Sequence, residues 1–155
     1  MSPDELRYVE DLGAWMEGLG SSRMGGRVWG TLLLSDATEM SGPEIAEELE
    51  VSAGSISAAT RALVSLGMIE RRRIPGDRKD YFAIRPDSYI TLIRRREHVI
   101  EIFTDLVRRG LRIAEGRPVP TERLEEFLEF YVWLSDRFHK LIDEWFEERS
   151  SNAEA

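Results

Sequence analysis

The most informative group of functional side chains in this sequence is a cluster of basic residues suited to binding phosphate. The 155-residue chain has a net charge of −8, yet residues 61–96 hold ten basic and four acidic side chains. Such cations give affinity for a nucleic-acid backbone without sequence information. The basic members are Arg61, Arg71, Arg72, Arg73, Arg78, Lys79, Arg85, Arg94, Arg95 and Arg96. The alternative is that the run of arginines only keeps a strand edge solvated.

The segment just before this cluster has a face that could contact base pairs. At helical spacing, one side of residues 53–61 carries small or hydrogen-bonding side chains and no carboxylate. These residues are Ala53, Gly54, Ser57, Ala58 and Arg61. Because a major groove about 12 Å wide admits a helix with such a face, the pattern predicts a recognition helix.

Two short helices and a hairpin are predicted to position these side chains. Ser41 and Glu44 have the spacing of a capping box at the start of the first helix, and Ser52 is a good N-cap for the second. The inner face of the second helix carries apolar residues three and four positions apart: Ile56, Ala59, Leu63 and Leu66. Residues 68–74 and 81–84 are β-prone, and the Pro-Gly-Asp between them is typical of a turn. The order predicts a helix-turn-helix followed by a β-hairpin wing.

This arrangement resembles the winged-helix transcriptional regulators of the MarR superfamily, in particular its GbsR-like branch. The resemblance is carried by residues 26–34, 44–49, 51–57, 63–69 and 75–82. It implies a bacterial homodimer that represses or activates from a near-palindromic double-stranded DNA operator and often releases it when a small-molecule effector binds. With the charge pattern, it predicts these DNA contacts: Ser41, Ser52, Ser55, Ser57, Ala58, Arg61, Arg71, Arg73, Arg78 and Lys79.

The tip of the wing has two candidates for the residue that enters the minor groove. Regulators of this kind often carry an Asp-x-Arg triplet there, and the matching triplet here is Asp77-Arg78-Lys79. The third position is therefore lysine, which leaves both cations open. An arginine suits a narrow, negative groove better than a lysine does, so Arg78 is favoured.

The rest of the chain is predicted to be helical, which gives a mostly α fold with a small β-hairpin wing. Helices in residues 1–20 and 87–149 should form a dimerisation layer beside a winged helix-turn-helix region, residues 21–86, with residues 150–155 a disordered tail. A loop at residues 116–120 divides the C-terminal part into two long helices, the second capped by Thr121. The length suits one compact unit.

The last predicted helix has the most regular apolar pattern. Large side chains recur at heptad-like spacing, and we predict that they form a dimer interface: Leu124, Phe127, Tyr131, Leu134, Phe138, Leu141 and Trp145. Phe130, Trp133 and Phe146 lie off this seam, so the helix is apolar on more than one side. Such a surplus indicates a partner, and a second copy is the simplest one.

Ligand and metal sites have weaker signals. Trp15, Trp29 and Trp133 could line an effector pocket, since aromatic rings attract flat or cationic ligands; the alternative is that they fill the core and the interface. His139 and Asp143 lie one helical turn apart and could share a metal. No third ligand is in reach, so an ordinary surface contact is the simpler interpretation, and no metal is predicted.

Several classes of function are not expected. The chain has no cysteine for disulfides, zinc-thiolate sites or redox sensing. It has neither an apolar stretch of about 20 residues nor a signal-peptide-like start, which predicts a cytoplasmic protein without membrane contact. No phosphate loop or nucleophile elbow is present, so neither catalysis nor a cofactor is expected. The remaining alternative is a winged-helix module that binds protein instead of DNA.

Overall fold

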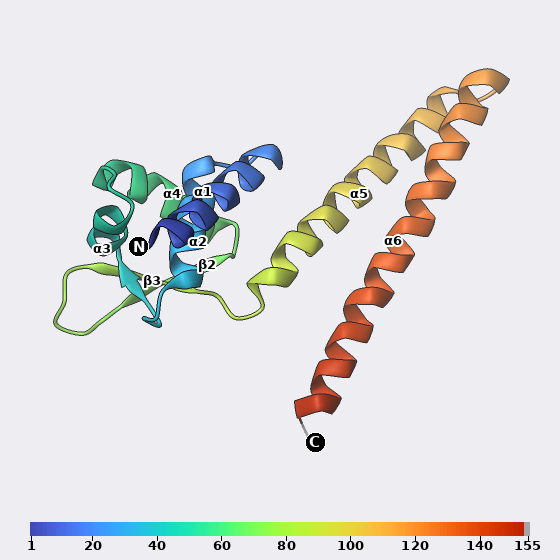
Figure 1. Ribbon diagram of the computed structural model, residues 1–155. Helices are drawn as coiled ribbons and strands as arrows, with labels where there is room; N and C mark the ends of the chain where they lie inside the picture. Colours follow the sequence, from blue (N-terminus) through green and yellow to red (C-terminus); the bar gives the residue numbers. More distant parts are fainter. Residues whose placement is uncertain (154–155) are drawn as a thin grey trace. The chain divides into compact units, whose positions relative to one another are not determined.

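The computed structural model describes the backbone of residues 1–153 and all side chains except those of residues 92, 95, 96 and 150–153. This part of the chain is mostly helical, with one small antiparallel sheet (Figure 1). It divides into two compact units, Met1–Thr91 and Leu92–Ala155. The length alone predicted a single unit; the structure has two because each half packs chiefly on itself.

The first unit begins with two helices that cross closely. Helix α1 spans Pro3–Gly18 and helix α2 spans Arg23–Leu34, and serine side chains cap the N-termini of both. At the crossing, Gly26 of α2 lies against the backbone of α1, where an added Cβ would come within 2.6 Å of the Leu12 carbonyl oxygen. A glycine is therefore required for this approach of the two backbones.

The helix-turn-helix forms as predicted. Helix α3 spans Gly42–Glu48 behind the capping box of Ser41, and helix α4 spans Ala53–Ser65 behind the N-cap Ser52. Glu50 in the turn between them has a φ of 53°, a left-handed conformation that few non-glycine residues adopt. The inner faces of the helices bury Ile45, Leu49, Ile56, Ala59 and Leu63. This small core fixes the orientation of α4.

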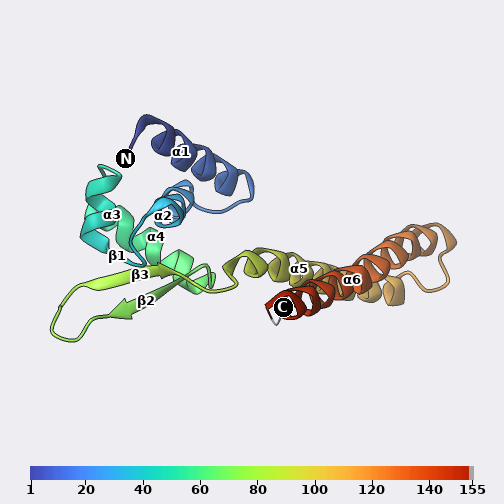
Figure 2. The same cartoon turned by 60° about the horizontal axis from the view of Figure 1, so that its bottom comes forward.

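The sheet contains the predicted wing and one additional strand. Strand β2 spans Ile69–Arg73 and strand β3 spans Asp80–Ile84, and they pair antiparallel, which confirms the hairpin. Strand β1, Met40–Ser41, pairs with the other edge of β3, giving the order β1-β3-β2. The sequence did not predict β1, because two residues carry no periodic signal. Figure 2 shows the turn of the hairpin extending beyond the helices of this unit.

The second unit is formed by two long helices. Helix α5 spans Ser88–Ile113 and helix α6 spans Pro118–Ala153. The prediction that Thr121 caps α6 is wrong, because proline is well tolerated in the first turn and the helix begins at Pro118. The Thr121 hydroxyl instead donates to the carbonyl oxygens of Arg117 and Ala114. Helix α6 also extends beyond residue 149, where the tail was expected to start, and residues 154–155 lie outside the described residues.

Aromatic and small residues join α5 to α6, which run side by side in Figures 1 and 2. The rings of Phe103 and Tyr131 are 4.7 Å apart, and Phe103 also meets Phe127 edge-on at 6.1 Å. The side chain of Leu124 fits over Gly110, where a Cβ would be 3.2 Å away. None of the helices described is both long and apolar enough to cross a membrane.

Candidate nucleic-acid interface

The outer face of α4 has the composition that the sequence predicted. Ser57, Ala58 and Arg61 are exposed, whereas Ile56 and Leu63 on the opposite face are buried. No residue of α4 is acidic. In the described part of the chain, no hydrogen bond or ion pair engages the Arg61 guanidinium. The helix therefore offers solvent one unpaired cation among small side chains, which suits insertion into a major groove.

Ser52 and Ser55, at the first turn of α4, form the hydrogen bonds that begin the helix. The Ser52 hydroxyl accepts a hydrogen bond from the Ser55 backbone amide and lies 2.9 Å from the Ser55 hydroxyl. Ser52 is exposed and Ser55 is half-buried. Ser52 thus caps the helix and Ser55 donates to the cap. Backbone N–H groups in the first turn of a helix are favourable for a phosphate oxygen.

The prediction that Ser41 contacts DNA is wrong. Its relative exposure is 0 %. Its amide donates to the Glu44 carboxylate at 2.6 Å, and its hydroxyl accepts from the Glu44 amide. Hydrogen bonding to Ser41 lowers the pKa of Glu44. Ser41 is therefore part of the scaffold that starts α3, and its capping-box spacing already contained that signal.

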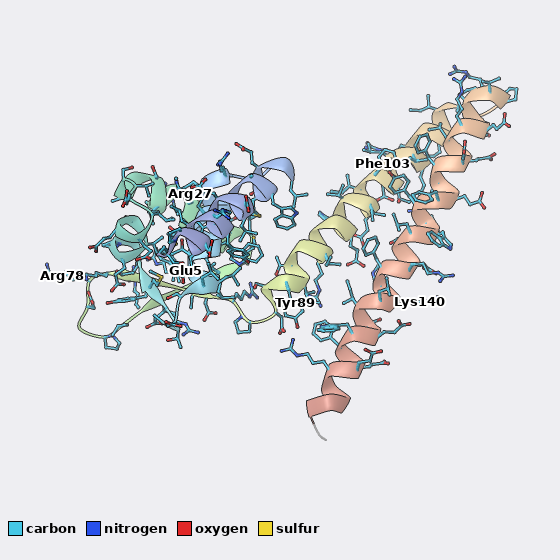
Figure 3. All side chains as sticks on the ribbon, viewed as in Figure 1. Glu5, Arg27, Arg78, Tyr89, Phe103 and Lys140 are labelled. Carbon is cyan, nitrogen blue, oxygen red and sulfur yellow. The ribbon has the colours of Figure 1, made fainter. Side chains whose placement is uncertain are left out.

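The tip of the wing is organised by Asp77. Its carboxylate accepts hydrogen bonds from the Lys79 amide at 2.9 Å and the Tyr81 hydroxyl at 2.8 Å. The Lys79 amide, and then the Tyr81 hydroxyl, lower the pKa of Asp77. Gly76 supplies the positive φ of the turn, 86°. Arg78 is exposed and lies at the outer edge of the hairpin (Figure 3), so Asp77 shapes the loop that carries this cation.

The three consecutive arginines of β2 are paired with carboxylates. Asp80 lies 3.1 Å from the Nε of Arg71 and 3.5 Å from the Nε of Arg73. Arg72, which alternation places on the other face of the strand, pairs with Glu70 at 2.6 Å. Arg71 and Arg73 were predicted to contact DNA, and Arg72 was not. Asp80 was missed as their partner because it is found only once the register of the hairpin is known.

A groove of about 540 Å³ separates α4 from the sheet. Ser57 and Arg61 line it from the helix, and Arg71, Asp80 and Phe82 line it from the hairpin. Two of the predicted contact cations therefore face the same concave surface. The concavity is formed entirely within the first unit.

Comparison with known proteins identifies the family. A MarR-family model matches residues 24–80, and a model of MmpR5-like MarR-family transcriptional regulators matches residues 87–149. The HTH-type transcriptional regulator MmpR5 of Mycobacterium tuberculosis is 33% identical over 135 residues, covering 86% of this chain and 82% of that protein. This chain belongs to the MarR family of transcriptional regulators. A crystal structure described as a transcriptional regulator is 31% identical, covers 94% of this chain and 99% of its own, and superposes with a TM-score of 0.78.

The three tryptophans predicted to line an effector pocket are divided between the two units of this MarR-family chain. Trp29 is buried in the core of the first unit, and Trp15 is half exposed on α1. Trp133 belongs to the second unit, where it stacks on Phe130 and lies under the Arg137 guanidinium, 5.3 Å from the ring centroid. The core-filling interpretation describes Trp29, while an effector pocket lined by Trp15, Trp29 and Trp133 stays a prediction.

The predicted dimer seam of this regulator divides into two sets. Leu124, Tyr131, Leu134 and Phe138 are half-buried, and Leu124 and Tyr131 contact α5 of the same chain. Phe127, Leu141 and Trp145 are exposed by 51%, 62% and 46%. The exposed set is joined by Phe130 and Trp133, which are 52% and 53% exposed. With Val119 and Val132, which are 55% and 41% exposed, these residues form the exposed apolar surface described on α6.

The two histidines each lie close to a glutamate carboxylate within the second unit. His139 of α6 lies 3.0 Å from the Glu97 carboxylate of α5, and His98 lies 3.4 Å from Glu101. The sequence interpretation paired His139 with its neighbour Asp143. No group of three or more histidine or acidic side chains suited to a metal occurs among the described residues.

Proposed function

We propose that this MarR-family chain is a homodimeric repressor that binds a near-palindromic DNA operator in the bacterial cytoplasm. The observation that carries the proposal is the exposed face of α4, where Ser57, Ala58 and Arg61 stand beside a groove that also contains Arg71. Small residues allow close approach to the bases, and an arginine can donate two hydrogen bonds to a guanine. On this account α4 gives sequence discrimination and the wing gives affinity.

We assign the minor-groove contact to Arg78. In the described structure no hydrogen bond or ion pair engages its side chain, and the loop that carries it is fixed by Asp77. The charge of Lys79 acts on the nearby Glu44 carboxylate, whose pKa is lowered first by Ser41 and further by this lysine. Lys79 thus has a carboxylate nearby that competes with phosphate, whereas no carboxylate pairs with the Arg78 side chain in the described structure.

The partner of the apolar surface of α6 is proposed to be a second copy. Phe127, Phe130, Trp133 and Leu141, which are 51–62% exposed on one helix, form a patch of the kind that marks an interface. A two-fold dimer places two recognition helices about 34–36 Å apart, which matches one turn of DNA. Dimerisation therefore doubles the number of base pairs contacted and explains a near-palindromic site.

Release of DNA by a small-molecule effector is part of the proposed regulation. Any ligand that favours one spacing of the two recognition helices changes operator affinity. The tryptophans do not define its chemistry, so we propose no class of effector. Membership of the GbsR-like branch stays a prediction based on the resemblance of residues 26–34, 44–49, 51–57, 63–69 and 75–82. The proposed DNA binding does not depend on it.

Fluorescence anisotropy on a selected duplex and on random duplexes tests the base-contact assignment. We expect Arg61→Ala to weaken binding to the selected duplex by about 1–3 kcal/mol and to random duplexes by less. Arg7→Ala, an exposed arginine on α1 whose nearest carboxylate is Asp4 at 4.0 Å, is the matched control and should change neither. Equal losses on both kinds of DNA would leave Arg61 as a phosphate contact only. No DNA binding by the unmodified chain would favour the protein-binding alternative.

Light scattering tests the dimer separately. Leu141→Glu places a charge on the exposed surface of α6 without disturbing its contacts with α5, and should give monomers with weak operator binding. Lys140→Glu introduces the same side chain one position earlier, at an exposed polar site, and should leave the dimer intact. A Leu141→Glu protein that remains dimeric would place the interface elsewhere.

A further inference from the structure

Asp80 is a carboxylate placed among the cations of the proposed DNA-binding groove. It begins β3 directly opposite Arg73 in the hairpin register. One of its oxygens lies 3.1 Å from the Nε of Arg71 and 3.5 Å from the Nε of Arg73. The two arginines are two positions apart in β2 and so share one face of the strand. A single acidic residue therefore engages both.

This pairing occurs on the groove side of the hairpin. Arg71 and Asp80 line the same concavity as Ser57 and Arg61 of α4. A phosphate that enters the groove between α4 and the wing consequently meets the Asp80 carboxylate together with Arg71, a cation that it would bind. The negative charges of the phosphate and of Asp80 repel each other, and solvent weakens this repulsion without removing it.

The other acidic residues of the hairpin have different positions. Asp77 accepts hydrogen bonds from the turn and maintains its shape. Glu70 pairs with Arg72 on the opposite face of β2 and does not line the groove. Asp80 thus differs from both, because it lines the groove and contacts Arg71, which also lines it, together with the neighbouring Arg73. Since its side chain is 39% exposed and those of Arg71 and Arg73 are 45% and 75% exposed, these are weak surface ion pairs that phosphate can displace.

We propose that Asp80 is a positioning residue that lowers affinity for DNA by holding Arg71 and Arg73 away from phosphate. This inference rests on the proposed DNA binding. Its consequence is regulatory: a genome offers a large excess of non-specific sites, and affinity for these sites comes almost entirely from phosphate contacts. A carboxylate that competes with phosphate for two cations reduces this background, so that contacts from α4 decide where the protein stays.

The test is a salt titration of random-sequence duplex binding with Asp80→Asn, a substitution of nearly the same shape without the charge. We expect affinity to rise roughly three- to tenfold. The log–log salt slope should become steeper by about 0.9 for each arginine released to a phosphate. Glu70→Gln is the matched control, because it makes the same charge change in the same hairpin but outside the groove, and its effect should be under about twofold.

A double-mutant cycle separates the ion pair from general charge. When Arg71 and Arg73 are both replaced by alanine, Asp80→Asn should raise the affinity for random-sequence duplex much less than it does in the unmodified chain. The inference is overturned if Asp80→Asn weakens binding, since Asp80 would then orient the arginines for DNA, or if it matches Glu70→Gln, since net charge alone would then be responsible. If the unmodified chain binds no duplex, the proposed function itself is refuted. If the unmodified chain binds DNA and Asp80→Asn binds with the same affinity, only the inference about Asp80 is refuted.

Discussion

Replacing Gly26 with alanine should destabilise the first unit, although alanine is the better helix former. An alanine Cβ at this position would lie 2.6 Å from the Leu12 carbonyl oxygen and 2.7 Å from the Gly13 Cα. Both distances are well inside the 3.4 Å at which ordinary contact begins. Both neighbours are backbone atoms, so no rotation of a side chain can relieve the contact. The whole of α1 must move away from α2.

The magnitude follows from two opposing effects. Exchange of glycine for alanine inside a helix is worth about 1 kcal/mol in favour of alanine. Overpacking costs about 1–3 kcal/mol and occasionally more, and contacts with two backbone atoms place Gly26 at the upper end. The free energy of unfolding should therefore fall by about 2 kcal/mol. For a chain of this length, that corresponds to a decrease in Tm of roughly 4–8 °C.

Chemical denaturation followed by far-UV circular dichroism, at one fixed protein concentration, measures the difference. The control is Gly25→Ala, one residue earlier in the same helix. Its Cβ would be 3.6 Å from the nearest atom, the Ser22 Cβ, which is ordinary contact, so this variant should be more stable by about 0.5–1 kcal/mol. Opposite signs at adjacent glycines are the expected result. Stabilisation by both substitutions would refute the close crossing of α1 and α2.

Two further predictions concern charged side chains. Arg27→Met removes a half-buried guanidinium that lies 2.8 Å from a Glu10 oxygen and donates to the Leu49 carbonyl oxygen at the end of α3. The free energy of unfolding should therefore fall by about 1–3 kcal/mol. A fall of less than about 0.5 kcal/mol would contradict a stabilising role for Arg27. The Ser135 carbonyl oxygen, and then the Glu97 carboxylate, raise the pKa of His139 in the folded chain. Protonation of His139 therefore stabilises the fold, fully so below the unfolded-state pKa of about 6.5. This stabilisation is lost as the pH rises through the folded-state pKa. His139→Gln should flatten the pH dependence of unfolding in that window, and an unchanged profile would show that His139 has no such role.

Local signals in the sequence predicted the elements that carry the proposed site. The capping box at Ser41, the N-cap at Ser52 and the turn before Asp77 each depend on residues a few positions apart, and all three were found where expected. The apolar face of α4 follows from helical spacing in the same way. Such features are visible in sequence because the interactions that cause them are themselves local.

The features that the sequence did not predict depend on contacts between distant segments. Strand β1 exists only because Met40 pairs with Phe82. The pairing of Asp80 with Arg71 requires the register of the hairpin. In α6, the heptad-like spacing predicted an apolar seam but could not distinguish Tyr131, which packs on α5, from Leu141, which is exposed. Side-chain spacing defines a face of a helix, and only packing determines what covers it.

DNA recognition by α4 and the wing is best tested by selection from a randomised duplex pool, followed by titration of the selected duplex across salt concentrations. We expect enrichment of a near-palindromic sequence whose half-sites are one helical turn apart. We also expect an affinity that falls steeply with salt, with a log–log slope of about −0.9 for each phosphate neutralised. A pool without enrichment, or binding that does not respond to salt, would contradict the assignment of α4 and the wing to DNA.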